Sequence, residues 1–500
     1  VMRQNIHNKW LTLLAVACGT FMATLDASIV NVALPSITSY YGTGLSQSRW
    51  VVIAYLFSIT GLLLFFGKIA DLINRRLIFQ MGFITFSVGS LLCGLANSIE
   101  QLILFRGLQG FGAAMLMANG PAIITAAFPG NERGQALGIL SMAVSSGLAI
   151  GPTFGGFLVN FFDWSGVFFI NCPIGVVGFI LVSRFVPASL GMALENKAAK
   201  DSFDREQKLP IVLRLQIYFS RLMGMDWVGA VLWMTVQFGF VLSIDRENLL
   251  GLNPAIHQLV SFGTLGLFIL FLMWEASIKD PLLDLRLFRS RIFFSANVSS
   301  LMSFVALSSL TLLMPFYLQN ARFLTPDHVG LIMTALPLTT FCIAPFSGKL
   351  SDIYGSRVLT TVGMVLLCLA LALLGLPWFG LTSEKPHMII LHLILVGIGI
   401  GLFQSPNNNT IMSDVSLTRL GVASALLATM RNFGLVIGTA LGSALLMHFY
   451  SYDLRVNREQ TSEAVHFTVA LRYTFLCIAA LTSVGIFTCL LGRNKVPEGA

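Results

Sequence analysis

The chain has 500 residues, of which 55% are hydrophobic and only 11% are charged. Its mean hydropathy of +0.80 excludes a soluble domain of this size, whereas apolar runs of about 20 residues suit a bilayer. The formal net charge of +8 does not indicate a nucleic-acid-binding protein, because its distribution along the chain follows a membrane topology.

Apolar runs long enough to cross a bilayer recur along the whole chain. They lie at 10–35, 49–70, 77–97, 101–127, 134–160, 165–187, 225–245, 256–275, 292–318, 328–350, 358–379, 387–412, 420–447 and 469–492. In lipid a helix satisfies its own backbone hydrogen bonds, so these runs predict an all-α membrane protein with fourteen transmembrane helices. The first run follows a polar decapeptide and has no cleavage site, so we expect no removable signal peptide.

The basic residues are distributed unequally between the two sets of loops. Of the 31 Lys and Arg residues, we assign 22 to the side that holds both termini and seven to the opposite side, while Arg106 and Arg431 lie within spans. By the positive-inside rule this asymmetry places both termini in the cytoplasm.

Two blocks of six spans resemble each other in sequence. The segment Gly67 to Arg76 recurs as Gly348 to Arg357, and the segment Gly147 to Gly156 recurs as Gly434 to Ser443, each at the same place in its block. Repeated six-helix halves typically enclose a binding site near the middle of the membrane. We therefore predict two six-helix bundles with an inserted pair of helices between them.

The predicted organisation has four parts. These are an N-terminal bundle at 1–187, a cytoplasmic linker at 188–224, the inserted pair at 225–291 and a C-terminal bundle at 292–500. The last part of the linker, 210–223, mixes apolar and basic residues. It fits either an interfacial helix on the inner leaflet or a solvated segment.

Asp26 and Arg106 are charged residues inside predicted spans, where charges are costly and usually functional. From the rise of a helix, Asp26 lies about 24 Å along the first span and Arg106 about 8 Å into the fourth. The two residues therefore lie at similar depths. Apolar surroundings favour the protonated form of an acid, whereas a nearby cation favours its ionised form. The pair therefore suits a carboxyl group that gains and loses a proton. A static ion pair between two helices, or an acid that directly counters a cationic substrate, are the alternatives.

Polar residues in later spans are candidates for a substrate cavity. Arg431 has no acid near it in sequence, so it could bind an anionic group or backbone carbonyls, or only orient Asn432. A patch of amides in span 12 could bind a ligand or join two helices. The predicted cavity residues are Asn31, Gln404, Asn407, Asn408, Arg431 and Asn432.

A stripe of glycines runs along span 5. Gly147, Gly151 and Gly155 are four residues apart and so share one helix face, which permits close contact with another helix. Pro152 removes a backbone donor and bends the helix. The stripe could be a simple packing groove, or a bend that shapes a transport path. We expect it to face a partner in the other half of the molecule.

The two basic loops that follow span 2 of each block are candidates for conformational gating. Their leading glycines, Gly67 and Gly348, predict tight turns between helices. Asp71 could cap another helix or form a latch with Arg133, and the basic residues could instead anchor the loop to anionic headgroups. The gating candidates are Gly67, Asp71, Arg75, Arg76, Arg133, Asp352 and Arg357.

These motifs resemble those of the major facilitator superfamily, and within it the fourteen-span drug:proton antiporter family, over essentially the whole chain. The segment GKIADLINRR at 67–76 is similar to the family's loop motif, with Asn74 where Gly is usual, since Asn tolerates a left-handed backbone. The segments LDASIVNVALPSI at 25–37 and LFRGLQG at 104–110 resemble its span 1 and span 4 motifs. The glycines and proline of span 5 match the antiporter motif at every position, namely Gly138, Gly147, Gly151, Pro152, Gly155 and Gly156.

The resemblance implies proton-driven efflux of amphipathic, drug-like compounds across the bacterial cytoplasmic (inner) membrane, with Asp26 carrying the proton. Export of a dedicated lipid, siderophore or metabolite is the alternative. We expect no enzyme activity, no cofactor other than the proton gradient, and no metal, because the seven cysteines have no metal-ligand spacing. The expected partners are a small amphipathic substrate, protons and the lipid bilayer, not nucleic acid. We expect a monomer and leave open an accessory periplasmic adaptor.

Overall fold

The computed structural model describes residues 2–129, 132–187, 213, 226–244, 253–278, 281–283, 285–377, 381, 386–415, 420–456 and 462–491. Within these residues, fourteen helices are long and apolar enough to cross a membrane, as the sequence predicts. The protein is a multi-pass membrane protein with an all-helical fold. The linker at 188–224, including its candidate interfacial helix, lies almost entirely outside the described residues.

The first six spans are formed by seven helices. These are α1 (Met2–Tyr41), α2 (Leu45–Leu72), α3 (Arg75–Gly94), α4 (Ile99–Ala127), α5 (Arg133–Phe162), α6 (Gly166–Phe169) and α7 (Asn171–Phe185). The predicted span 165–187 is therefore broken at Ile170, between α6 and α7.

The last six spans are formed by α12 (Arg291–Phe316), α13 (Pro326–Tyr354), α14 (Ser356–Gly375), α15 (Pro386–Ser413), α16 (Leu420–Val456) and α17 (Glu463–Leu491). A short 3-10 helix η1 (Leu285–Arg289) precedes α12, and a π-helical turn η2 (Tyr317–Ala321) follows it. The long α16 continues well beyond the predicted end of its span at 447.

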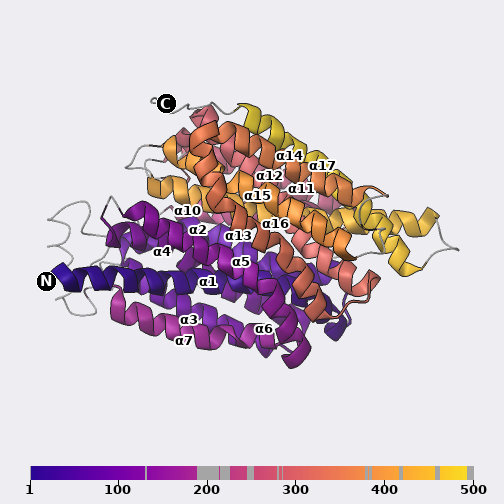
Figure 1. The fold of residues 1–500 in the computed structure, drawn as a ribbon, viewed down its shortest axis with the longest axis horizontal. Coiled ribbons are helices and arrows are strands. Elements are labelled where there is room, and N and C mark those ends of the chain that lie inside the picture. The colour runs from indigo at the N-terminus through magenta and orange to yellow at the C-terminus, as the bar shows by residue number, and fades with distance from the viewer. Residues whose placement is uncertain are drawn as a thin grey trace.

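The two groups of six spans lie side by side (Figure 1). They meet where α5 contacts α13 and where α2 contacts α16. Helix α1 begins and α17 ends at the same end of the bundle, which we call the terminal end. The opposite end, at which α1 ends and α2 begins, is the distal end. The division of the chain into four domains stays a prediction.

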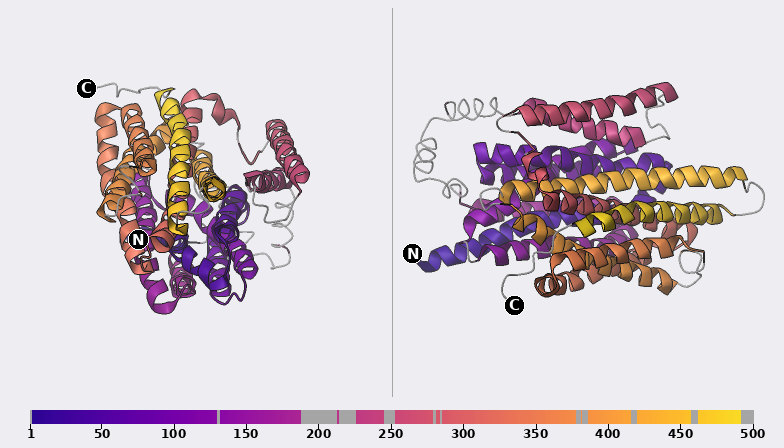
Figure 2. Two further views of the ribbon diagram at one scale, coloured as in Figure 1. Left: turned by 90° about the vertical axis from the view of Figure 1, so that its right-hand side faces the viewer. Right: turned by 90° about the horizontal axis from the view of Figure 1, so that it is seen from above.

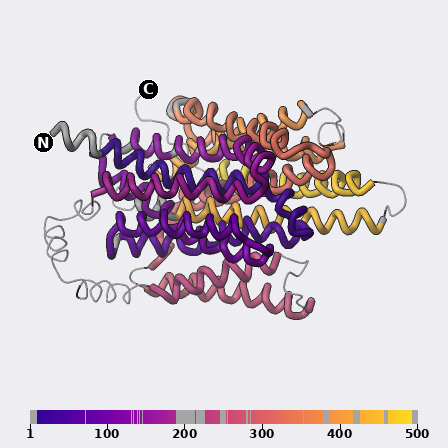
Figure 3. The backbone as a smooth tube through the Cα atoms, turned by 90° about the horizontal axis from the view of Figure 1, so that it is seen from below, coloured from indigo at the N-terminus to yellow at the C-terminus, as the bar shows by residue number. Residues whose placement is uncertain are grey.

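The inserted helices α10 (Trp227–Ile244) and α11 (Pro254–Ser277) lie on the outside of the bundle (Figures 2 and 3). Trp227 packs against Phe65 of α2, with ring centroids 4.9 Å apart, and Trp233 packs against Phe433 of α16, at 5.6 Å. Helix α10 therefore contacts both groups of six spans.

A pair of carboxylates is buried where α10 begins and α11 ends. Asp226 accepts hydrogen bonds from the Gly229 backbone N–H and from Trp274 Nε1, and Glu275 accepts one from the Leu283 backbone N–H. The remaining oxygens, Asp226 Oδ2 and Glu275 Oε1, are buried without a hydrogen-bond partner. They lie 2.1 and 2.8 Å from the point that a Cβ on Gly229 would occupy, so both oxygens face the same small space.

The turns after the second span of each block differ from the prediction. Gly67 and Gly348 lie inside α2 and α13, so neither makes the tight turn. Gly355 makes the second turn instead, with a φ of 83°. In the first turn Asn74 is extended, with a φ of −174°, and caps α3 by accepting hydrogen bonds from the Arg76 and Leu77 backbone N–H groups. Its role is therefore a helix cap and not a left-handed turn.

Candidate functional site

Asp26 and Arg106 form a fully buried ion pair between α1 and α4. Arg106 Nη1 lies 2.6 Å from Asp26 Oδ2, and the two side chains are 1% and 0% exposed. The similar depth deduced for the two residues therefore corresponds to direct contact. Their proton-coupling role stays a prediction.

Arg106 is held in place by further contacts. Its Nε donates to the Val51 carbonyl of α2 at 3.1 Å, and its Nη1 also donates to Gln109 Oε1 at 2.6 Å. The guanidinium lies 4.0 Å from the centre of the Tyr55 ring, close enough for a cation–π interaction. These contacts compensate part of the cost of burying the charge.

Two amides complete the hydrogen bonding of Asp26. Gln109 Nε2 and Asn171 Nδ2 each donate to Asp26 Oδ1 at 2.8 Å, and both also donate to Ser90 Oγ at 3.0 Å. Sequence reasoning missed Gln109, Asn171 and Ser90. Gln109 could have been found, because it lies three residues after Arg106 and so shares its helix face.

A cavity of about 220 Å³ lies between the two groups of six spans. Its wall is mostly apolar and is formed by α1, α2, α4, α5, α12, α13, α15 and α16. Arg106 and Tyr55 line it, while Asp26 lies behind them and is not exposed. A cavity of this kind, apolar with a few polar groups, is typical of a small-molecule site.

Five of the six predicted cavity residues line this cavity, namely Asn31, Gln404, Asn408, Arg431 and Asn432. The prediction for Asn407 is wrong. Its side chain is 3% exposed and donates to the Ala296 carbonyl of α12, so it joins two helices. Neighbouring residues of a helix point to different sides, and span 12 turns Gln404 and Asn408, but not Asn407, toward the cavity.

The glycine stripe of α5 contacts α1, in the same half of the molecule. A Cβ on Gly147 would lie 2.4 Å from Thr24 Oγ1, and a Cβ on Gly151 would lie 2.5 Å from Ser28 Cβ. A Cβ on Gly155 would lie 3.2 Å from Ile29 Cα of α1, a tight but less severe contact. The expectation that the stripe faces the other half is therefore wrong for these three glycines, because α1 fills that face.

The last part of the motif does reach the other half. A Cβ on Gly156 would lie 2.4 Å from the Pro326 carbonyl oxygen of α13. The Pro152 carbonyl oxygen lies 2.2 Å from the point that a Cβ on Gly330 would occupy. Pro152 also lines the cavity, so the proline lies where α5, α13 and the cavity meet.

The gating candidates lie at the terminal end. Arg75 Nη1 donates to the Ala122 carbonyl at 3.3 Å and Arg76 Nη2 donates to the Ser183 carbonyl at 2.5 Å, so both tie α3 to neighbouring helices. Gly67 is inside α2 with open space around it, and Arg357 is in the first turn of α14. The side chains of Asp71, Arg133 and Asp352, and the surroundings of Gly138, lie outside the described residues.

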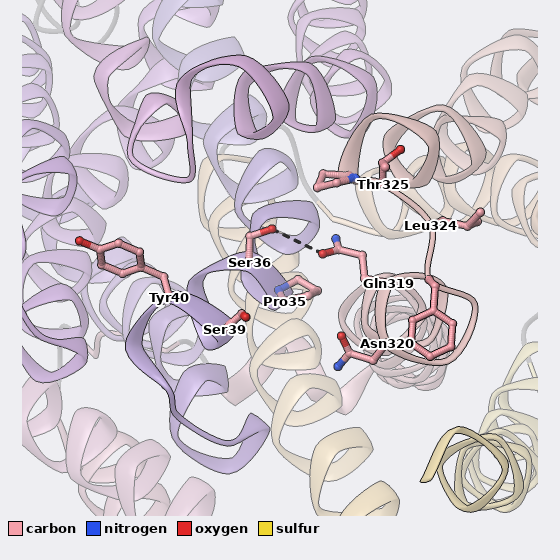
Figure 4. A pocket seen from close by; sticks show the side chains of 10 residues that line it. Pro35, Ser36, Ser39, Tyr40, Gln319, Asn320, Leu324 and Thr325 are labelled. Carbon is pink, nitrogen blue, oxygen red and sulfur yellow. Dashed lines mark hydrogen bonds between the residues drawn. The ribbon is translucent and has the colours of Figure 1, made fainter. Parts of the chain in front are cut away.

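Hydrogen bonds join the two halves toward the distal end. Ser36 of α1 donates to Gln319 Oε1 at 3.5 Å (Figure 4). Gln319 Nε2 donates to the Val32 carbonyl at 3.1 Å. Arg49 of α2, which is 1% exposed, donates to Ser443 Oγ of α16 at 2.8 Å. The π-helical turn η2 contributes Gln319 and Asn320 to a recess of about 530 Å³ at this end.

Comparisons with known proteins agree with this architecture. The family model described as Major Facilitator Superfamily matches residues 16–296 and 292–500. The riboflavin transporter RibZ of Clostridioides difficile is 31% identical over 494 residues, which cover 99% of each chain. The multidrug resistance protein Stp of Mycobacterium tuberculosis is 30% identical over 461 residues, covering 91% of this chain and 79% of Stp.

A solved structure shares the fold at low sequence identity. The crystal structure of a bacterial homolog to the human lysosomal transporter Spinster, in an inward-facing and unoccupied conformation, has a TM-score of 0.66. It is 14% identical and the match covers 97% of each chain. The chain belongs to the major facilitator superfamily of membrane transporters, among relatives of the multidrug-efflux type.

Proposed function

We propose that this protein is a proton-coupled antiporter that exports amphipathic, drug-like small molecules by alternating access. The observation that supports this most directly is the Asp26–Arg106 ion pair, which is buried beside the central cavity. A carboxylate with one cationic and two amide donors is stable while charged, and it loses the ion pair when a proton is added.

The proposed coupling acts through helix positions. Asp26 does not line the cavity, so a proton on Asp26 and a substrate in the cavity would affect each other through α1 and α4 rather than by contact. Protonation weakens the attachment of α1 to α4. The proton is taken up while the cavity is open to the outer face and released while it is open to the cytoplasm, and its release restores the Asp26–Arg106 ion pair.

The proposed orientation has the terminal end, and both chain termini, in the cytoplasm of a bacterium, and the distal end on the outer face of its inner membrane. We propose a monomer that needs no cofactor besides the proton gradient and leave an accessory periplasmic adaptor open. Since α10 contacts α2 and α16 together, the inserted pair would follow both halves during the change of state.

The test is transport into inverted vesicles that contain the purified chain, with an imposed proton gradient and a panel of riboflavin, fluorescein and rhodamine 123. We expect at least one compound to accumulate, and its accumulation to be lost in Asp26→Asn. Asp163→Asn is the matched control, because it makes the same chemical change at an exposed residue outside the cavity. Accumulation by Asp26→Asn with an unchanged pH dependence would refute the coupling role.

A second candidate is transport of riboflavin or a similar metabolite. It is favoured by RibZ, whose similarity covers 99% of both chains. Riboflavin that accumulates while both dyes do not would support this function over broad drug export. If the substrate is a dedicated lipid or siderophore, none of the three compounds should accumulate. Transport of that substrate should still depend on the proton gradient.

A further inference from the structure

Arg431 of α16 lines the central cavity without a partner. It forms no hydrogen bond or ion pair with any residue that the structure describes, and it is partly exposed to the cavity. It lies within the membrane span Leu426–Arg455. A charge at that depth is costly unless a counter-charge or strong acceptors compensate it. The partner that the fold does not supply can be supplied by the cargo.

The charge of the cavity wall is positive. Among its described lining residues the only ionisable side chains besides Tyr55 are Arg106 and Arg431. Arg106 is neutralised by Asp26, which the wall encloses, so Arg431 provides the net charge. A permanently cationic molecule would meet this charge with no exposed carboxylate to offset it, whereas an anionic molecule would be attracted.

Side-chain amides add further polar groups to the cavity that contains Arg431. Gln404 and Asn408 of α15 and Asn432 line the same cavity as Arg431. From α1, Asn31 contributes an Oδ1 atom that is buried and has no hydrogen-bond partner. Apolar residues such as Leu336 and Met333 make up much of the remaining wall. The cavity therefore combines an apolar surface with one cation and several amide groups.

We propose that the cavity selects amphipathic molecules that carry an anionic acceptor group, such as a carboxylate or phenolate, with Arg431 as the residue that binds that group. Permanent cations are disfavoured. This inference rests on the proposed function, because it concerns the cargo of the same cavity. Arginine suits the task, since its planar guanidinium offers several donors to a carboxylate in a fixed geometry.

The test compares two dyes that share the xanthene scaffold and differ in charge. Binding of fluorescein, an anion, and of rhodamine 123, a cation, is measured by fluorescence anisotropy on the detergent-solubilised full chain without any gradient. A hydrogen bond to a charged group changes affinity by about tenfold or more, so we expect fluorescein to bind at least about tenfold more tightly.

The same experiment is repeated on three variants. Arg431→Gln should weaken fluorescein binding about tenfold and leave rhodamine 123 binding unchanged or tighter. Arg431→Lys, which keeps the charge but not the planar group, should give an intermediate loss. Arg184→Gln is the matched control at an exposed arginine outside the cavity, and it should change neither dye.

Tighter binding of rhodamine 123 than of fluorescein to the native chain would overturn the proposal, as would an equal loss of both dyes in Arg431→Gln. The comparison on the native chain tests the charge selectivity even if a variant does not fold. Because binding is measured without a gradient, the result is independent of coupling. Normal pH dependence in Asp26→Asn would refute the antiport proposal and leave the charge selectivity standing.

Discussion

Adding one methyl group to the α5 stripe should separate α5 from α1. In Gly151→Ala the new Cβ would lie 2.5 Å from both Ser28 Cβ and Ser28 Oγ, and 3.4 Å from the Ile29 backbone N. The Cβ of Ser28 is attached to the backbone of α1 and cannot rotate away. Ordinary contact between carbon atoms is about 3.5–4.0 Å, so the two helices must move apart by about 1 Å.

The expected free-energy change is the sum of two opposing effects. Overpacking a close contact costs about 1–3 kcal/mol, while replacing a helical Gly by Ala returns up to about 1 kcal/mol. Gly151→Ala should therefore lower the free energy of unfolding by up to about 2 kcal/mol. Since Ser28 is only two residues from Asp26, the shift of α1 should also disturb the contact between Asp26 and Arg106 and slow transport.

The assay is thermal unfolding of the purified protein together with dye accumulation in vesicles. Gly263→Ala is the control, because Gly263 lies in α11 with nothing within 4 Å of its would-be Cβ. The control should melt at the native temperature or above, while Gly151→Ala melts lower and transports more slowly. If Gly151→Ala matches the control in both measurements, α1 and α5 do not make the close contact described.

Two further changes test other parts of the molecule. Arg49→Gln removes a charged donor that joins α2 to α16 at the distal end. The distance between spin labels at Ser39 and Asn320, which line the distal recess, should then show about tenfold more of a population with a longer distance. An unchanged distance distribution would refute a role for Arg49 in holding the distal end together. Glu275→Gln provides an amide that can donate to Asp226 Oδ2, which has no hydrogen-bond partner. The variant's free energy of unfolding at pH 8 should therefore exceed that of the native chain by about 1–3 kcal/mol, seen as a higher melting temperature. A lower melting temperature would contradict this.

The sequence alone determined the membrane architecture. Hydropathy reports the transfer of each segment into lipid, which is a local property, so the fourteen apolar runs correspond to fourteen candidate membrane spans. The charges Asp26 and Arg106 could also be paired in advance, because helical rise places both at the same depth and a buried charge needs a partner.

The tertiary structure decided which faces of these helices meet. Hydropathy does not specify the rotation of a helix about its axis, since lipid-facing and buried positions are both apolar. For this reason the sequence did not show that Asn171 reaches Asp26, that the α5 stripe contacts α1, or that Asn407 turns away from the cavity. Arg431 shows both contributions. Its charge and depth could be deduced from the sequence, whereas only the packing of the neighbouring helices showed that it has no hydrogen-bond or ion-pair partner among the described residues.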